Sequence, residues 1–197
     1  VTQGGAADWL SMAWANNLLG NPSGAAVIEV TLGGLTLEAR DDCCLALTGA
    51  DLGALLDGQP LMPWRSFIVR KGQRLQFSQP RLGVRAYLAA PGGFNAPAVL
   101  GSCATVVREE LGGLDGMGRP LARGAELSYS GTAPSLREVP GALRPGFSDT
   151  PALDLVLGAQ HGEFSGQSLF DAFNSTWTLD SRADRMGIRL LGPALQY

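Results

Sequence analysis

Two short segments with alternating apolar and polar residues flank Gly33-Gly34, and this pattern constrains the fold more than any other. Residues 27–32 alternate Ile, Val and Leu with Glu and Thr, and residues 35–40 repeat the alternation. A period of two is typical of a half-buried strand. Glycine tolerates the positive φ angles of tight hairpin turns. The sequence therefore predicts an antiparallel hairpin, and with it a chain built on β-sheets.

Other strand-like segments recur along the chain at intervals of about ten residues, which is typical of a barrel or sandwich. Glycine (27) and proline (12) make up a large share of the 197 residues and separate most of these segments. We therefore expect a mainly β, or β-rich α+β, fold with a few short helices. The further predicted strands are 44–48, 66–70, 74–77, 84–89, 126–129, 153–157, 176–179 and 188–191.

Two segments have a helical pattern. Residues 8–19 start at Asp8, a good N-cap, and carry Trp9, Met12, Ala13 and Asn16 on one face. Residues 167–174 form the second predicted helix. A stretch rich in proline and glycine, 131–151, predicts a linker. The expected domains are therefore 1–130, a β-barrel with an N-terminal helix, and 152–197, an incomplete second subdomain.

Charge and composition exclude several classes of protein. The 15 basic and 18 acidic residues form no runs and give a net charge of -3, so a nucleic-acid partner is not expected. The longest nearly uncharged apolar stretch, 43–56, is too short to cross a bilayer. The first residues, from Val1, lack the pattern of a signal peptide. Three cysteines and one histidine make no metal-ligand spacing, so we expect reduced thiols, no metal and a cytoplasmic location.

Nucleophilic catalysis has little support in the sequence. The only histidine, His161, lies in a polar stretch without a Gly-x-Ser-x-Gly motif, and we interpret it as a loop residue. Asp51 ends an apolar strand and is a base, a ligand contact or a turn cap. Gly92-Gly93 follows a strand and either forms a turn or offers backbone N–H groups to an anion.

Polar residues on regular elements are the other candidates. Asn16 lies in an apolar helical stripe, so its amide either locks a neighbouring loop or meets a ligand. Arg85 and Tyr87 share one face of a strand, where they are an outward pair or an anion-binding pair. Residues 181–187, which include Arg185, are dense in charge for this chain, and indicate ion pairing, a site or an interface.

Several short motifs, in this order and spacing, resemble the family of carboxyltransferase subunits that includes the C subunit of 5-oxoprolinase and allophanate hydrolase subunit 2. The chain departs from the usual pattern at Gly4, Ala7, Cys103 and Ala183, and resembles a member truncated at both ends. The resemblance implies cyclophilin-like β-barrel subdomains. The matching segments are 5–8, 15–21, 47–51, 85–89, 92–93, 100–102, 111–113, 184–187 and 189–190.

The resemblance also implies a function as the C subunit of a 5-oxoprolinase-type complex, in which ATP-dependent hydrolysis opens 5-oxoproline to glutamate. Its expected partners are the A subunit of such a complex and its KipI-like B subunit, and the chain alone is expected to be inactive. The alternatives are a biotin-dependent urea carboxylase-type carboxyltransferase and a non-catalytic regulator of a KipI-like partner. No cofactor is expected in this chain, since ATP would be used by the complex and biotin would sit on a separate carrier.

A chain offering carboxylates, amides and arginines suits polarisation and orientation of a small amide or lactam. We therefore expect Asp51, Asp8 and Arg185 to be catalytic. The predicted substrate-binding residues are Asn16, Arg85, Tyr87, Gly92, Gly93 and Ser102.

Overall fold

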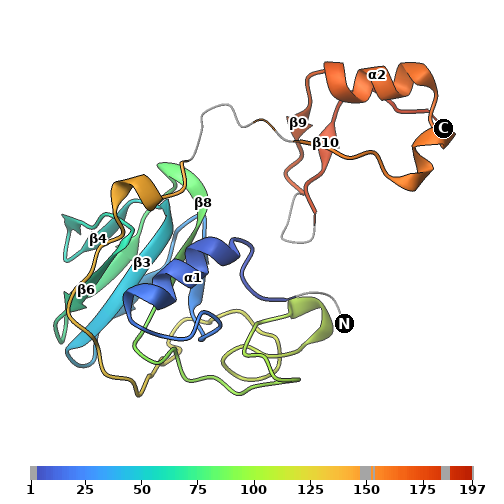
Figure 1. Ribbon diagram of the computed structural model, residues 1–197. Helices are drawn as coiled ribbons and strands as arrows, with labels where there is room; N and C mark the ends of the chain where they lie inside the picture. Colours follow the sequence, from blue (N-terminus) through green and yellow to red (C-terminus); the bar gives the residue numbers. More distant parts are fainter. Residues whose placement is uncertain (1–3, 147–151, 153, 183–186, 197) are drawn as a thin grey trace. The chain divides into compact units, whose positions relative to one another are not determined.

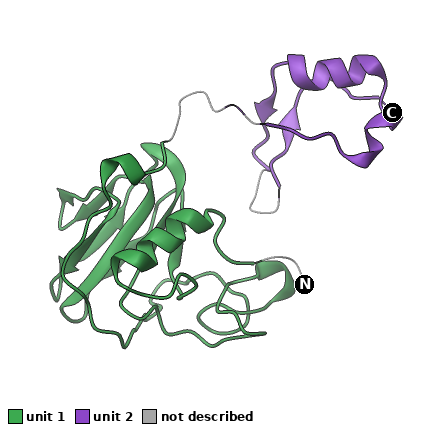
Figure 2. Cartoon of the chain, viewed as in Figure 1, with its two compact units in different colours: residues 1–147 green, residues 148–197 purple. Residues whose placement is uncertain are grey.

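The computed structural model describes residues 4–146, 152, 154–182 and 187–196 (Figure 1). The chain divides into two compact units, residues 1–147 and 148–197 (Figure 2). Strands in antiparallel sheets make up most of the regular structure of the described residues, which also contain two α-helices. The prediction of a mainly β fold with a few short helices is confirmed. No helix in these ranges is long and apolar enough to cross a membrane.

Unit 1 is built on two four-stranded antiparallel sheets. The first sheet has the order β1 (Ile28–Thr31), β8 (Leu82–Ala89), β3 (Cys43–Asp51) and β6 (Arg65–Val69). The second has the order β2 (Thr36–Glu38), β7 (Arg74–Phe77), β4 (Ala54–Leu56) and β5 (Gln59–Pro60). Strands β3 and β8 are the longest, and they pair at the centre of the first sheet.

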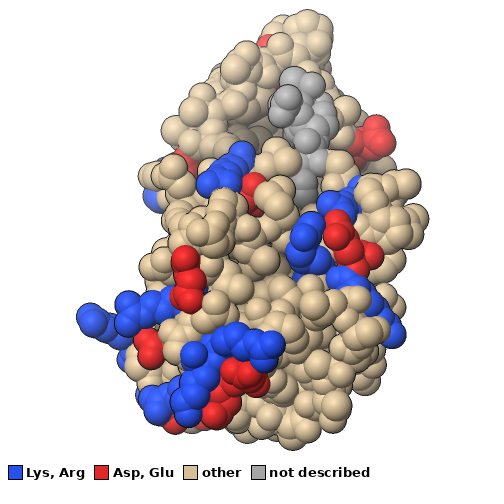
Figure 3. All heavy atoms as spheres, turned by 90° about the vertical axis from the view of Figure 1, so that its left-hand side faces the viewer, with Lys and Arg blue, Asp and Glu red and all other residues tan. Residues whose placement is uncertain are grey.

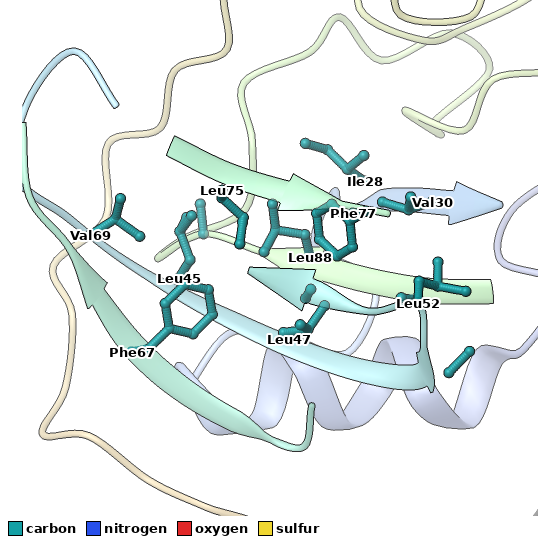
Figure 4. Packing of buried hydrophobic residues seen from close by; sticks show 14 residues of the cluster. Ile28, Val30, Leu45, Leu47, Leu52, Phe67, Val69, Leu75, Phe77 and Leu88 are labelled. Carbon is teal, nitrogen blue, oxygen red and sulfur yellow. The ribbon is translucent and has the colours of Figure 1, made fainter. Parts of the chain in front are cut away.

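The two sheets share one apolar core. Leu47 and Leu88 from the first sheet meet Leu75 and Phe77 from the second, and all four side chains are buried (Figure 4). The opposite face of the first sheet packs against α1 (Trp9–Leu18). Because both faces of β3 are covered, seven consecutive residues of this strand are buried.

The N-terminal helix begins where the sequence predicts. Asp8 is its N-cap and accepts a hydrogen bond from the Ser11 backbone. The buried face differs from the expected stripe, because Ser11, Ala15 and Leu18 point to the sheet together with Asn16, whereas Trp9 is 70% exposed.

The predicted hairpin is wrong, although both of its strands form. β1 pairs with β8, and β2 pairs with β7 in the other sheet. Leu32, Gly33 and Gly34 all have positive φ, and these residues connect the two sheets. A Cβ on Gly33 would lie 2.7 Å from the Ser78 carbonyl oxygen, so glycine is required where the connection passes this backbone.

The later part of unit 1 contains less regular structure than expected. Residues 126–129 form no strand, although the Ser128 carbonyl accepts a hydrogen bond from Asn95. Residues 131–146, within the predicted linker, lie in unit 1, where Val139 is buried and donates its backbone N–H to Trp64. This part also contains the 3-10 helices η1 (Val107–Glu109) and η2 (Gly141–Leu143).

Unit 2 contains η3 (Ala159–Glu163), α2 (Gly166–Asn174) and the antiparallel pair β9 (Thr178–Leu179) and β10 (Leu190–Leu191). Ser165 caps α2 by accepting a hydrogen bond from the Ser168 backbone. The helix and both strands were predicted from the sequence, whereas residues 154–157 form no strand. Among the described residues of this unit, no apolar side chain is buried.

Candidate functional site

Four polar residues meet where the start of α1 approaches β1 and β8, and Asp8 takes part through its backbone N–H. They are Asp8, Glu29, Arg85 and Tyr87, and we call them the Glu29 cluster. Glu29 lies directly opposite Tyr87 in the register of β1 and β8, and Arg85 lies two residues before Tyr87 on the same face. The structure therefore brings together three residues predicted from the sequence, Asp8, Arg85 and Tyr87, around a fourth that was not predicted.

The hydroxyl group of Tyr87 is the centre of this cluster. Tyr87 is fully buried, and its oxygen accepts a 2.7 Å hydrogen bond from the Asp8 backbone N–H. The same hydroxyl donates to Glu29 Oε2 at 2.9 Å. One oxygen atom thus joins the helix start to the neighbouring strand.

The protonation of Tyr87 follows from this position. Burial raises the pKa of its hydroxyl far above the usual value of 10.0, and the adjacent Glu29 carboxylate acts in the same direction. Tyr87 therefore remains neutral at physiological pH and serves as a hydrogen-bond donor.

Glu29 and Arg85 form an ion pair at the edge of the cluster. Arg85 Nε lies 3.6 Å from Glu29 Oε1, and the two side chains are 27% and 15% exposed. Glu29 Oε2 also accepts a 2.9 Å hydrogen bond from the Ala7 backbone. Arg85 Nε is buried and has no hydrogen-bond partner among the residues that the structure describes. The guanidinium thus faces a fixed carboxylate at a distance longer than a hydrogen bond.

Asp8 is held by its own helix. Its carboxylate accepts hydrogen bonds from the Ser11 backbone at 3.0 Å and from the Ser11 hydroxyl at 2.5 Å. The Ser11 carbonyl in turn accepts a 2.6 Å hydrogen bond from the buried hydroxyl of Thr48 on β3. Both Asp8 oxygens therefore stabilise the helix start, as expected for an N-cap.

Asn16 locks a neighbouring loop, one of the two roles that the sequence left open. It has no exposed surface, and its amide donates to the carbonyls of Ser23 and Ala25 at 3.1 and 3.0 Å. Its Oδ1 accepts a 3.0 Å hydrogen bond from Asn21. Both donor hydrogens of the amide are used within the protein.

The Gly92-Gly93 turn does not present two open N–H groups. The backbone N–H of Gly92 donates to Asn21 Oδ1 at 2.7 Å, and that of Gly93 donates to the Ala90 carbonyl at 2.9 Å. A Cβ on Gly93 would lie 2.9 Å from the Ala26 nitrogen, so the glycine allows close backbone packing. In this arrangement the turn is structural.

The remaining predicted residues lie elsewhere. Asp51 ends β3 next to a β-bulge and accepts a hydrogen bond from Gly53, which is the geometry of a turn cap. Ser102 lies in an exposed loop and accepts from Ala104. Arg185 lies outside the described residues. His161 lines an otherwise largely apolar hollow of about 270 Å³ in unit 2.

No group of three or more metal-ligating side chains occurs in the described part of the chain. Surface charges lie in mixed groups on the face drawn in Figure 3, where Lys and Arg neighbour Asp and Glu. Exposed ion pairs of unit 1 include Arg70 with Asp42 at 2.7 Å and Arg74 with Glu38 at 3.1 Å, whichever face they occupy. This face carries no broad patch of one sign.

Glu29 and Asn21 are the polar residues that sequence reasoning missed. Glu29 occupies the polar face of an alternating strand, which is normally a solvated position. Its burial follows from the pairing of β1 with β8, because that pairing places Tyr87 opposite it. In the predicted hairpin, residues 27–32 would pair with residues 35–40, and that pairing gives no reason to expect Tyr87 opposite Glu29.

The chain is similar to known proteins over its whole length. The model of the family described as carboxyltransferase domain, subdomain A and B, matches residues 1–197, so the chain belongs to this family. It is 33% identical to the 5-oxoprolinase C subunit of Haemophilus influenzae and 35% identical to that of Escherichia coli. Both alignments cover 100% of this chain and 62% of the relative, so the chain spans less than two thirds of these proteins.

A solved structure extends the comparison. The urea carboxylase of Kluyveromyces lactis superposes with a TM-score of 0.81 and 26% sequence identity, over 98% of this chain and 18% of that protein. The family match and these relatives confirm the resemblance predicted from short motifs. By their names, the relatives are enzymes or subunits of enzymes.

Proposed function

We propose that this chain functions within the C subunit of a 5-oxoprolinase-type complex. The observation that carries the proposal is the similarity, along the complete chain, to the 5-oxoprolinase C subunits of two bacteria. In such a complex the lactam ring of 5-oxoproline is opened to give glutamate. The family resemblance supplies the co-substrate, ATP, and the partners, which are the A subunit of the complex and its KipI-like B subunit.

The chemistry of the Glu29 cluster supports this proposal. Amide polarisation needs hydrogen-bond donors and acceptors held in fixed positions, and it needs no nucleophile from this chain if another protein of the complex activates the substrate. Glu29, Arg85 and Tyr87 are fixed by a shared network. ATP would be handled by a partner protein. The three free cysteines agree with a cytoplasmic complex, where thiols stay reduced.

A second function is favoured by the likeness to the Kluyveromyces lactis urea carboxylase. In that case the chain would belong to a carboxyltransferase acting on urea, and biotin would arrive on a separate carrier. The two functions differ in substrate and in cofactor, so they predict different products.

The deciding experiment assembles the full protein with its two expected partner proteins and measures glutamate release from 5-oxoproline with and without ATP. ATP-dependent glutamate formation that requires all three proteins would support the proposal. A parallel assay supplies urea, bicarbonate, ATP, a biotin carboxylase and a biotinylated carrier protein. Carboxylation of urea without turnover of 5-oxoproline would establish the second function instead.

A further inference from the structure

Two arginines of unit 1, Arg65 and Arg144, converge on a single carboxylate oxygen. Arg65 Nη2 lies 3.2 Å from Glu138 Oε1, and Arg144 Nη2 lies 2.5 Å from the same atom. Other exposed ion pairs of unit 1 join one basic side chain to one carboxylate. One carboxylate cannot neutralise two guanidinium groups. These three residues, which we call the Glu138 triad, therefore keep an uncompensated positive charge.

The backbone places the three side chains of the Glu138 triad. Residues 137–139 run along β6, the last strand of the first sheet, and backbone hydrogen bonds of 2.9 Å join the two segments. This pairing sets Glu138 opposite Arg65. Arg144 follows η2, and its Nε donates to the Val139 carbonyl at 2.9 Å. Because the guanidinium groups are already positioned, little conformational freedom is lost when an anion binds them.

Most N–H groups of the two guanidinium groups have no acceptor in the described part of the chain. A guanidinium carries five N–H donors. Arg65 donates through Nη2 alone, and its buried Nε has no hydrogen-bond partner. Arg144 donates through Nε and Nη2. The two side chains are 38% and 31% exposed, so each reaches the surface with donors that the fold does not use.

The Glu138 triad is separate from the Glu29 cluster. Arg65 lies opposite Leu47 of β3, whereas Tyr87 lies opposite the next residue, Thr48. Consecutive residues of a strand point to opposite faces of the sheet. The side chain of Arg65 therefore leaves the first sheet on the face opposite to Tyr87.

We propose that the Glu138 triad binds a phosphate group, either as free phosphate or as the phosphate end of a nucleotide. A carboxylate has two oxygens, and Glu138 already presents one to both arginines. A phosphate group has at least three acceptor oxygens and about two negative charges at neutral pH, so it can accept from Arg65 and Arg144 together. Glu138 is a positioning residue that holds both guanidinium groups. The inference goes beyond the proposed function and does not depend on it.

Calorimetric titration of the full protein with inorganic phosphate, ADP and acetate tests this site. The wild type should bind phosphate about tenfold more tightly than acetate, because acetate offers two oxygens and one charge. Arg65→Gln and Arg144→Gln should each weaken phosphate binding about tenfold, because each removes charge-assisted hydrogen bonds.

The role of Glu138 is tested by two substitutions. Glu138→Gln keeps an oxygen acceptor for the arginines and removes a negative charge, so it should strengthen phosphate binding about threefold. Glu138→Ala removes the acceptor as well, so the arginines lose their shared partner and this gain should disappear. A loss of stability alone would not produce opposite effects of Gln and Ala.

Two further variants are controls. Arg74→Gln removes an exposed arginine of unit 1 that faces one glutamate, Glu38, at 3.1 Å, and it should leave phosphate binding unchanged. Arg65→Lys keeps the positive charge without the planar fork, and it should retain only part of the affinity. It replaces Arg65→Gln if circular dichroism shows that variant unfolded.

The outcomes decide both the site and the source of its ligand. Phosphate binding that weakens in both arginine variants supports the inference. If ADP binds more tightly than phosphate, with the same dependence on both arginines, the ligand is the phosphate end of a nucleotide; if it binds equally or more weakly, the ligand is free phosphate. The inference is overturned if neither ligand binds, if acetate binds as tightly as phosphate, or if the affinities are unchanged in Arg65→Gln and Arg144→Gln.

Discussion

A single hydroxyl group, on Tyr87, connects three stretches of unit 1 that are far apart in the sequence. It accepts from Asp8 at the start of α1 and donates to Glu29 on β1, while its ring is buried beside Ala15 and Ala46. Removing such a buried hydroxyl leaves its partners without hydrogen bonds, which costs more than the bond itself contributes. The hydroxyl therefore matters for stability as well as for the position of Glu29.

The Tyr87→Phe variant should reveal this through pH. At pH 7 we expect a free energy of unfolding lower by roughly 1–3 kcal/mol, because two hydrogen bonds are lost. Above about pH 10 the tyrosine of the unfolded wild type ionises, whereas the raised pKa of folded Tyr87 keeps it neutral. Unfolding is then favoured as pH rises, by up to about 1.4 kcal/mol per pH unit.

Tyr87→Phe has no hydroxyl that can ionise at this position. Its free energy of unfolding should therefore fall less steeply than that of the wild type between pH 10 and 11. Urea unfolding at pH 7, 10 and 11 measures both effects in the two proteins. Equal slopes against pH would contradict the buried, neutral state of Tyr87.

At the level of elements, the sequence predicts most strands and both helices but not every partner. Alternation over 27–32 and 35–40 identifies two strands, because it depends only on each segment having one buried face. Which strand pairs with which depends on contacts between distant residues. β1 pairs with β8 because Ile28, Val30 and Leu88 complete the core between the sheets. The local sequence of residues 32–34 is compatible both with a hairpin turn and with a connection between two sheets.

The same limit applies to the candidate site. Asp8, Arg85 and Tyr87 could be selected because residue type and strand position mark them. Glu29 could not, because its importance comes from its register opposite Tyr87. Asn16 was recognised as a buried amide, but its partners Ser23 and Ala25 lie in a loop whose path no pattern predicts.

The β-bulge at the end of β3 requires glycine at position 49. Gly49 has φ of +85°, and a Cβ there would lie 2.6 Å from the Arg85 carbonyl oxygen. Gly49→Ala should therefore destabilise the protein by roughly 3 kcal/mol or more, because strain adds to a clash with a central strand. Gly72 is a matched control, since its φ is +84° and nothing lies within 4 Å of an added Cβ.

Gly72→Ala should cost only about 1 kcal/mol, the strain of a left-handed alanine. Urea unfolding measures the free energy of unfolding of both variants. The midpoints can be compared directly if the dependence of this free energy on urea concentration is unchanged. A loss of stability at Gly49 no larger than at Gly72 would show that the strands shift to accommodate the methyl group.

On the scale of the whole chain, the two units differ in how much apolar surface they bury. Unit 1 contains both clusters of buried hydrophobic residues. In the described part of unit 2 the buried side chains are Ser168 and Asp180, while Val156, Leu179 and Ile188 are each more than half exposed. Hydrophobic burial is the main favourable contribution to folding, so the units must differ in stability.

Two helices of similar length allow this difference to be measured within one molecule. α1 has ten residues and four of them are buried, whereas α2 has nine and only Ser168 is buried. A helix this short is marginal without packing. In hydrogen exchange of the intact chain, we expect α2 amides to open with about 1–2 kcal/mol and α1 amides with roughly 5 kcal/mol or more. Equal protection of the two helices would mean that the apolar surface of unit 2 is covered in solution.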